Sequence, residues 1–313
     1  MSINVTTSAN GTALNELLTP MILGATTLDR GLMRIVLNQQ DKVALSRFTT
    51  ALDKLEAPVD TPVTANDSMT KDEVVISVGD QMFYDTWNPL RDFEDDWSFF
   101  YSTGQLTDAQ AEPKIRSAIQ ETIIESVTNN LDNLIWNADT ASGNIWLQRM
   151  DGLIKLIEAN VDVNTVTNVG VIEKSNIFEI LDAMILATPD AVLESANPRI
   201  IMSHRDKQIY YSALRDAGIS KGVNIQDAGV DFYGGFPVVS CGIPKDHVVF
   251  TVASTGKDSN LVGATWMDVD YRGVKIERLQ ANSELWFGKV LFKFGVNIVF
   301  GGELTYYAGA VIP

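Results

Sequence analysis

The tripeptide His204-Arg205-Asp206 has the residues of a protein-kinase catalytic loop, in which the aspartate accepts a proton from the substrate hydroxyl. That chemistry also needs an asparagine five residues after the aspartate, where Tyr211 stands, and a glycine-rich phosphate loop upstream, which the sequence lacks. Ser203 and Asp206 instead fit the start of a helix, because a serine N-cap and an acidic first turn stabilise that end. The sequence therefore predicts a structural role for the tripeptide.

Residues 268–270, Asp-Val-Asp, begin like a calcium-binding loop, in which oxygen atoms hold the ion. Arg272 takes a ligand position and Leu279 stands where the bidentate glutamate belongs, so the pattern fails. The pair Gly256-Lys257 lacks the earlier glycine of a phosphate-binding loop. We predict a turn there, and no ion or phosphate site at either place.

The chain has two histidines, His204 and His247, which are too few for a His-rich metal site. No Gly-x-Ser-x-Gly elbow is present to place a serine nucleophile beside one of them. The sequence therefore predicts no catalytic residue, no cofactor-binding residue and no metal ligand, and a protein that is not an enzyme. A cytosolic two-domain enzyme that uses the α/β region 152–250 is the alternative from another class.

An acidic and aromatic stretch begins at Trp87 and contains Asp92, Glu94, Asp95 and Asp96. Four carboxylates could bind a metal ion or perform acid–base work. In a loop-like segment flanked by aromatic residues they are more typical of a solvated face, or of partners for arginines on a neighbouring subunit. Trp87, Asp95 and Asp96 are therefore candidates for contacts between subunits.

The composition predicts a folded chain with an ample core. The 313 residues correspond to one large domain or two of ordinary size, and 45% of them are hydrophobic, which excludes wholesale disorder. The single cysteine, Cys241, excludes an intrachain disulfide and fits a reducing compartment. Met1 is followed by polar residues, and no apolar run approaches the length of about 18 that a membrane span needs, so neither a span nor a standard secretion signal is expected.

The net charge of −16 argues against a surface whose main task is to grip nucleic acid, because neutralising phosphates requires clustered lysine and arginine. The charge is compatible with simple solubility, or with an inner wall that must not adhere to enclosed DNA.

A long two-faced helix is predicted for residues 113–136. It begins at Pro113, where proline is favourable, and its apolar residues recur at intervals of three and four. At a rise of about 1.5 Å per residue it would be roughly 35 Å long. Its predicted apolar face consists of Ile115, Ile119, Ile123, Val127, Leu131 and Leu134.

The residues before this helix contain little that could form a core of their own. Residues 1–40 are predicted to be an extended arm, and residues 43–52 and 73–87 the two strands of a long hairpin with a polar tip. A two-stranded hairpin alone is marginal in water, so we expect it to pack on a neighbour. The remaining candidates for contacts between subunits are Leu17, Leu18, Ile22, Phe48, Val74, Ile76 and Val78.

The second half of the sequence predicts an α/β region followed by antiparallel strands. Ser175 is predicted to cap one helix and Ser203 to open another, and Gly234-Gly235 forms a tight turn into a strand. The C-terminal strands are expected at Val274–Leu279, Val290–Phe294 and Val296–Phe300, with Gly295 as a kink.

This order of elements resembles the major capsid proteins of tailed double-stranded DNA bacteriophages, which have the HK97-like fold. The most sequence-like part of the resemblance is the run Asn197–Ser203, a helix that ends at Gly218, the stretch Gly234–Val239 (Gly-Gly-Phe-Pro-Val-Val) and the return at Ile243-Pro244. The resemblance extends in order and length over nearly the whole chain.

The resemblance implies an α+β fold in five parts. They are an N-terminal arm at 1–40, a long β-hairpin called the E-loop at 41–88, a first part of the peripheral domain at 89–151 with the spine helix 113–136, an axial α/β domain at 152–250, and a β-rich second part of the peripheral domain at 251–313.

It also implies a structural subunit that self-assembles in the host cytoplasm into hexamers and pentamers, forming the virion capsid around double-stranded DNA without sequence-specific binding. The sequence shows no long coiled-coil segment of the kind that some members use as a fused scaffold. A separate scaffolding protein is therefore implied, or the removal of such a segment, against which Met1 argues; a portal is implied as well. Cofactors and membranes have no part in this. An encapsulin-type compartment, similar in fold, is the nearer alternative.

Overall fold

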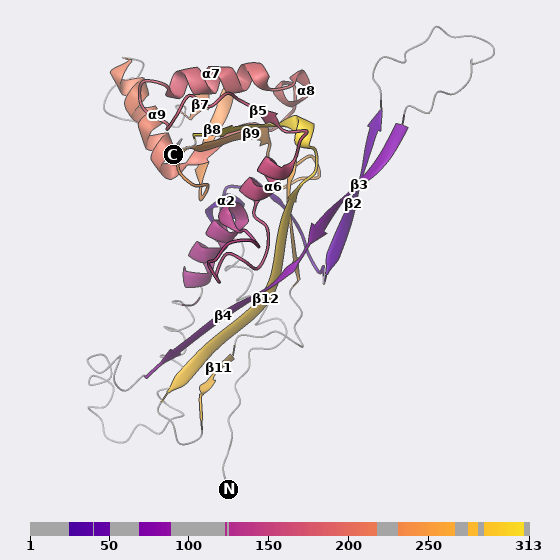
Figure 1. The fold of residues 1–313 in the computed structure, drawn as a ribbon, viewed down its shortest axis with the longest axis vertical. Helices are drawn as coiled ribbons and strands as arrows, with labels where there is room; N and C mark the ends of the chain where they lie inside the picture. The colour runs from indigo at the N-terminus through magenta and orange to yellow at the C-terminus, as the bar shows by residue number, and fades with distance from the viewer. Residues whose placement is uncertain are drawn as a thin grey trace, which may run out of the picture.

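A computed structural model shows an α/β domain at one end, a long sheet that runs away from it, and a hairpin that projects from the side (Figure 1). We call the α/β domain the axial domain, after the part that the resemblance implies. The residues that the structure describes are 25–39, 41–50, 69–88, 123, 125–217, 231–266, 275–280 and 285–309.

The axial domain contains a six-stranded sheet in the order β5-β13-β9-β6-β8-β7. Its strands are β5 (Asn164–Thr165), β6 (Pro198–Ser203), β7 (Phe232–Tyr233), β8 (Phe236–Cys241), β9 (His247–Val252) and β13 (Leu304–Ala308). The helices α7 (Ile177–Ala187) and α9 (His204–Asp216) cover one face, and the short α8 (Asp190–Leu193) follows α7 (Figure 1). The pair β6 and β8 is parallel, with α9 in the connection between them.

Both faces of this axial sheet are buried, which explains why its strands read as continuous apolar runs. Ile200 and Met202 point to the helices α7 and α9. Ile201 and Val249 point to the opposite face, where they join a second core with Leu131. That second core binds the axial domain to the helix of residues 125–137 and to the long sheet.

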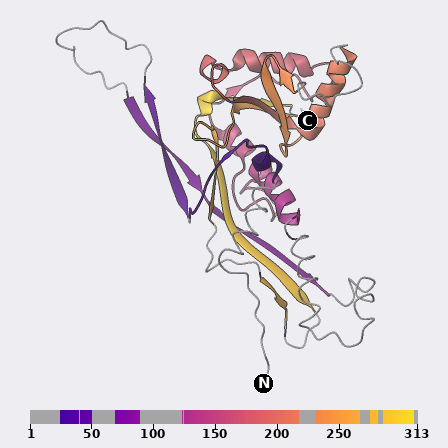
Figure 2. The ribbon, with the colours of Figure 1, turned by 180° about the vertical axis from the view of Figure 1, so that it is seen from behind.

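The long sheet has five strands, in the order β1-β10-β12-β11 with β4 paired to β12. They are β1 (Arg34–Val36), β4 (Gly79–Trp87), β10 (Leu261–Trp266), β11 (Lys275–Arg278) and β12 (Trp286–Ile298). The short helices α2 (Thr26–Asp29) and α6 (Leu153–Ala159), with residues 125–137, lie beside it in both views (Figures 1 and 2). The 3₁₀ turn η1 (Gly301–Glu303) leads from the long sheet into β13.

Several predicted local features are confirmed. Ser203 caps α9 by accepting a hydrogen bond from the Asp206 backbone N–H, and Gly234 and Gly235 form the turn into β8 with positive φ values of 57° and 91°. Ser175 is not a cap, because α7 begins one residue later, after Asn176.

Two predicted boundaries are wrong. The segment 73–87 is not one strand: it divides into β3 (Met69–Ser77) in the hairpin and β4 in the long sheet, so the hairpin ends at Ser77. The region 251–313 does not belong wholly to the peripheral domain, because β13 pairs with β9 in the axial sheet. Tyr306 and Tyr307 are buried on the two faces of that sheet, which holds the strand there.

Two glycines allow close backbone contacts at the boundary between β3 and β4, after Ser77. A Cβ on Gly79 would lie 2.4 Å from the Arg149 carbonyl oxygen, and a Cβ on Gly295 would lie 2.2 Å from the Ser77 carbonyl oxygen. The sequence predicted that Gly295 would lie between two strands. In the structure β12 runs through Gly295 without a break. The close approach of the two backbones is what requires glycine there.

Replacing Gly295 with alanine is expected to lower the free energy of unfolding by about 3 kcal/mol, because the new methyl group would meet a backbone atom that cannot turn aside. Urea unfolding of the purified chain measures the change. Gly143→Ala is the matched control, since a Cβ there has no heavy atom within 4 Å. Equal midpoints for the two variants would contradict the close approach.

Candidate functional site

The projecting hairpin is the first candidate assembly surface. It consists of β2 (Lys42–Thr50) and β3, paired antiparallel from Lys42 opposite Ser77 to Thr50 opposite Met69. The two strands form a sheet of their own, which stands away from the axial domain in both views (Figures 1 and 2). A two-stranded sheet with this exposure needs support at its base.

Polar contacts fix the hairpin to the body at its base. The Arg47 guanidinium pairs with Asp72 on the opposite strand, donates to the Val299 carbonyl oxygen at 3.0 Å, and lies 5.8 Å from the centroid of the Phe300 ring. Asn297 donates from its side chain to the Val75 carbonyl oxygen at 2.8 Å. These contacts join both strands to the end of β12 and therefore set the direction in which the hairpin projects.

The predicted contact residues of the hairpin differ in their surroundings. Ile76 and Val78 are buried against Val262 of β10 in their own chain, so the prediction that they contact a neighbour is wrong. The sequence shows an apolar face but not which core that face joins. Val74 is half-buried and Phe48 lies in β2 opposite Lys71, and both remain predictions.

The other predicted contact residues divide between the core and the undescribed segments. Trp87 is half-buried at the end of β4 and packs against the second core, which the long sheet and the axial sheet share. Its role between subunits remains a prediction. Outside the described residues lie Leu17, Leu18, Ile22, Asp95 and Asp96.

The predicted spine helix is helical over residues 125–137, and Ile123 is helical too. Ile123, Val127, Leu131 and Leu134 are all buried, at 3%, 5%, 0% and 8% exposure. They join the core that the long sheet and the axial sheet share. Ile115 and Ile119 lie outside the described residues.

Sequence reasoning missed a buried polar cluster beside this helix. Asp132 accepts hydrogen bonds from the Thr26 hydroxyl at 2.5 Å, the Thr27 backbone N–H at 3.0 Å and the Thr27 hydroxyl. The Trp136 indole N–H donates to the Thr27 hydroxyl at 2.8 Å. An aspartate next to an apolar stripe is the signal that could have found it. The cluster ties the start of α2 to the helix of residues 125–137.

Asp132→Asn is expected to lower the free energy of unfolding by about 2 kcal/mol, because hydrogen bonds to a buried charged group are lost or weakened. Thermal or urea unfolding measures it. Asp41→Asn makes the same change at an exposed position and should stay within about 0.5 kcal/mol of the wild type. A variant as stable as this control would show that the cluster does not hold α2.

An apolar groove lies between β4 and the helix of residues 125–137 and has a volume of about 590 Å³. Met82 and Tyr84 on β4, and Ile145 and Trp146 on the loop after the helix, line it and are exposed. Sequence reasoning missed all four. The signal for the last two is the apolar run Ile145-Trp146-Leu147 inside a mostly polar loop.

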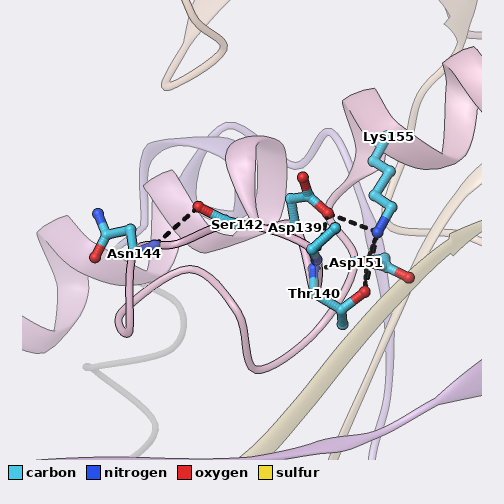
Figure 3. A network of polar contacts seen from close by, with 7 residues as sticks. Asp139, Thr140, Ser142, Asn144, Asp151 and Lys155 are labelled. Atoms are coloured by element: carbon cyan, nitrogen blue, oxygen red, sulfur yellow. Dashed lines mark hydrogen bonds and ion pairs between the residues drawn. The ribbon is translucent and has the colours of Figure 1, made fainter.

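A lysine on α6 holds the loop that carries this apolar run (Figure 3). Lys155 Nζ donates to Asp139 Oδ1 at 2.6 Å, to Asp151 Oδ1 at 2.7 Å and to Thr140 Oγ1 at 2.9 Å. The hydrogen bond from Lys155 is the main cause that lowers the pKa of Asp139. The ammonium group therefore draws together the two ends of the loop.

Within the described residues, the motifs that resemble enzyme sites do not come together into one. His204 lies at the start of α9, as predicted, and residues 254–258 form a turn in which the Ser254 hydroxyl donates to Asp258. Residues 268–270 lie outside the described part. Among the residues that the structure describes, no three His, Cys, Asp or Glu side chains gather where they could hold a metal ion. No helix in that part of the chain is long and apolar enough to cross a membrane.

Comparison with known proteins identifies the fold. No protein-family model matches the sequence, and no curated protein does. Among solved structures, a capsid chain of a native GTA particle matches with a TM-score of 0.59 and 10% identity, over 99% of this chain and 94% of that one. A chain of the satellite phage P4 procapsid matches with a TM-score of 0.56 and 13% identity, over 94% and 98%.

A chain from the capsid of the Myoviridae phage XM1 matches with a TM-score of 0.56 and 10% identity, over 91% of this chain and 92% of that one. The TM-scores and the nearly full coverage show a shared fold, although the sequence identities are low. The chain has the α+β HK97-like capsid fold that its order of elements led us to expect.

Proposed function

We propose that this chain is the major capsid protein of a tailed double-stranded DNA bacteriophage. Its role is structural and not enzymatic: copies assemble into hexamers and pentamers, which form the icosahedral capsid of the virion around the genome. The observation that carries the proposal is that capsid chains share its fold over 91–99% of its length. The projecting hairpin, whose described contacts with the body lie at its base, gives each copy a limb with which to reach another.

Assembly takes place in the host cytoplasm, with a separate scaffolding protein and a portal as partners. Contacts that are weak one by one become stable when they repeat around a closed lattice. The contact that closes a ring joins copies that are already linked, so it forms as an intramolecular contact. The net charge of −16 keeps an inner wall from adhering to packaged DNA.

The test is to express the full chain, alone and with the scaffolding protein encoded beside it, and to examine it by negative-stain electron microscopy and light scattering. We expect closed shells. Monomers alone under both conditions would overturn the proposal. Shells that form around a co-purifying enzyme, with no portal gene nearby, would assign the chain to an encapsulin-type compartment instead.

A further inference from the structure

A cleft of about 1100 Å³ lies at the edge of the axial sheet, next to the end of α2. Its walls come from β6, β8 and the start of α9. Three cationic side chains line it: Arg30, Arg199 and Lys207. Such a concentration of positive charge is unexpected on a chain with a net charge of −16.

The contacts that these cations make inside the chain leave an excess of positive charge. Lys207 Nζ pairs with Asp231 Oδ2 at 3.0 Å, Arg30 donates to the Ser240 hydroxyl at 2.7 Å, and Arg199 donates to the Arg30 carbonyl oxygen at 3.1 Å. Neither arginine forms an ion pair with any carboxylate in the described part of the chain. Three cations against the one carboxylate of Asp231 leave the cleft with two positive charges in excess.

His204 lies beside these cations in the cleft, where burial and the charge of Arg30 both affect its pKa. The pKa of His204 is lowered first by burial and next by the charge of Arg30. The imidazole of His204 lines the cleft as well, and the lowered pKa favours its neutral form. The free hydrogen-bonding edges of the two guanidinium groups suit planar carboxylates, which they can bind through two parallel hydrogen bonds.

The segment that joins the two hairpin strands has the complementary charge. Residues 51–68 contain Asp53, Glu56, Asp60 and Asp67 but one cation, Lys54, so four negative charges against one positive leave −3. The strands β2 and β3, which this segment connects, end at Thr50 and Met69 on the side of the molecule away from α9 and β7 (Figures 1 and 2).

Each copy has a hairpin on one side and a cleft of opposite charge on the other side. Two copies can therefore bind head to tail. Such a heterologous contact closes into a ring when the rotation between copies allows it. The strands β2 and β3 project away from α9, which helps to line the cleft of their own chain, so the complement of the hairpin must be on another copy.

We propose that the cleft formed by Arg30, Arg199 and Lys207 receives the hairpin tip, residues 51–68, of a second copy of this chain. The two guanidinium groups bind carboxylates of that tip and so set the register of the head-to-tail contact. The inference rests on the proposed function, since it names the partner of the hairpin within the shell.

Charge reversal on each side, and then on both sides together, tests the pairing. Arg30→Glu with Arg199→Glu reverses the cleft, and Asp53→Lys with Glu56→Lys and Asp60→Lys reverses the tip. We expect each reversal alone to lower the yield of shells by about tenfold or more, and the chain with both reversals to recover it. Arg215→Glu with Lys257→Glu is the matched control, because both are exposed and lie outside the cleft.

The outcomes separate this inference from the proposed function. A wild-type chain that never forms shells removes the proposed function itself. If the wild type assembles and the cleft variant assembles equally well, the inference is overturned; it is also overturned if the doubly reversed chain fails to recover. Normal shells that have lost bound nucleic acid would assign the cleft to phosphates instead. Circular dichroism of each variant before assembly confirms that the chain is folded.

Discussion

Replacing Leu131 with aspartate is expected to leave no folded protein. Leu131 has no exposed surface and lies where the helix of residues 125–137 meets both sheets. The change removes a buried leucine side chain and places a carboxylate where the surrounding core has no partner for it. Together these effects cost on the order of 5 kcal/mol or more, which equals the whole stability of many domains.

The measurement is the soluble yield of the full chain and its far-ultraviolet circular dichroism. Asn130→Asp is the matched control, since it introduces the same carboxylate one position earlier on the exposed face and should change stability by no more than about 0.5 kcal/mol. Leu131→Met preserves the volume and should cost less than about 1.5 kcal/mol. A soluble, folded Leu131→Asp chain would show that the helix is not central to the core.

The fate of Leu131 was predictable because helix periodicity is a local property. Apolar residues spaced by three and four define one face whatever the rest of the chain does, and the described part of that face is buried. The Ser203 cap and the Gly234-Gly235 turn are local in the same sense. Each depends on residues that are close together in the sequence.

The features that the sequence did not reveal depend on contacts between distant residues. The division after Ser77 requires Gly79 to meet Arg149 and Gly295 to meet Ser77, and nothing near Ser77 marks those partners. The strand β13 is short, and its local pattern did not show which of the two sheets it joins. The cluster at Asp132 joins residues more than a hundred positions apart.

The same limit explains the errors at the hairpin. Ile76 and Val78 have the alternation of a buried face, and the sequence alone did not distinguish a face buried in the chain's own core from one that another copy would cover. The hairpin therefore has two parts. Its base, near Val43 and Arg47, belongs to the body, and its outer part has no partner among the described residues of its own chain beyond the pairing of β2 with β3.

Removing that outer part is expected to abolish assembly while leaving the body folded. The pairing of Phe48 with Lys71 places these residues opposite each other, so residues 49–70 can be replaced by Asn-Gly, which favours the tight turn that a two-residue hairpin needs. The contacts of Arg47 and Asn297 remain. We expect unfolding close to that of the wild type and a loss of shells of about a hundredfold or more, because every ring loses the same contact.

A mixing experiment distinguishes a missing limb from a damaged fold. The shortened chain still presents the surface that receives a hairpin, but it has no tip to give to the next copy. When it is added in equal amount to the wild type, it should therefore terminate growing rings and lower the yield of wild-type shells, measured by sedimentation and electron microscopy. An unfolded chain would leave that yield unchanged. Normal shells formed by the shortened chain alone would show that the hairpin is dispensable and that the copies are joined elsewhere.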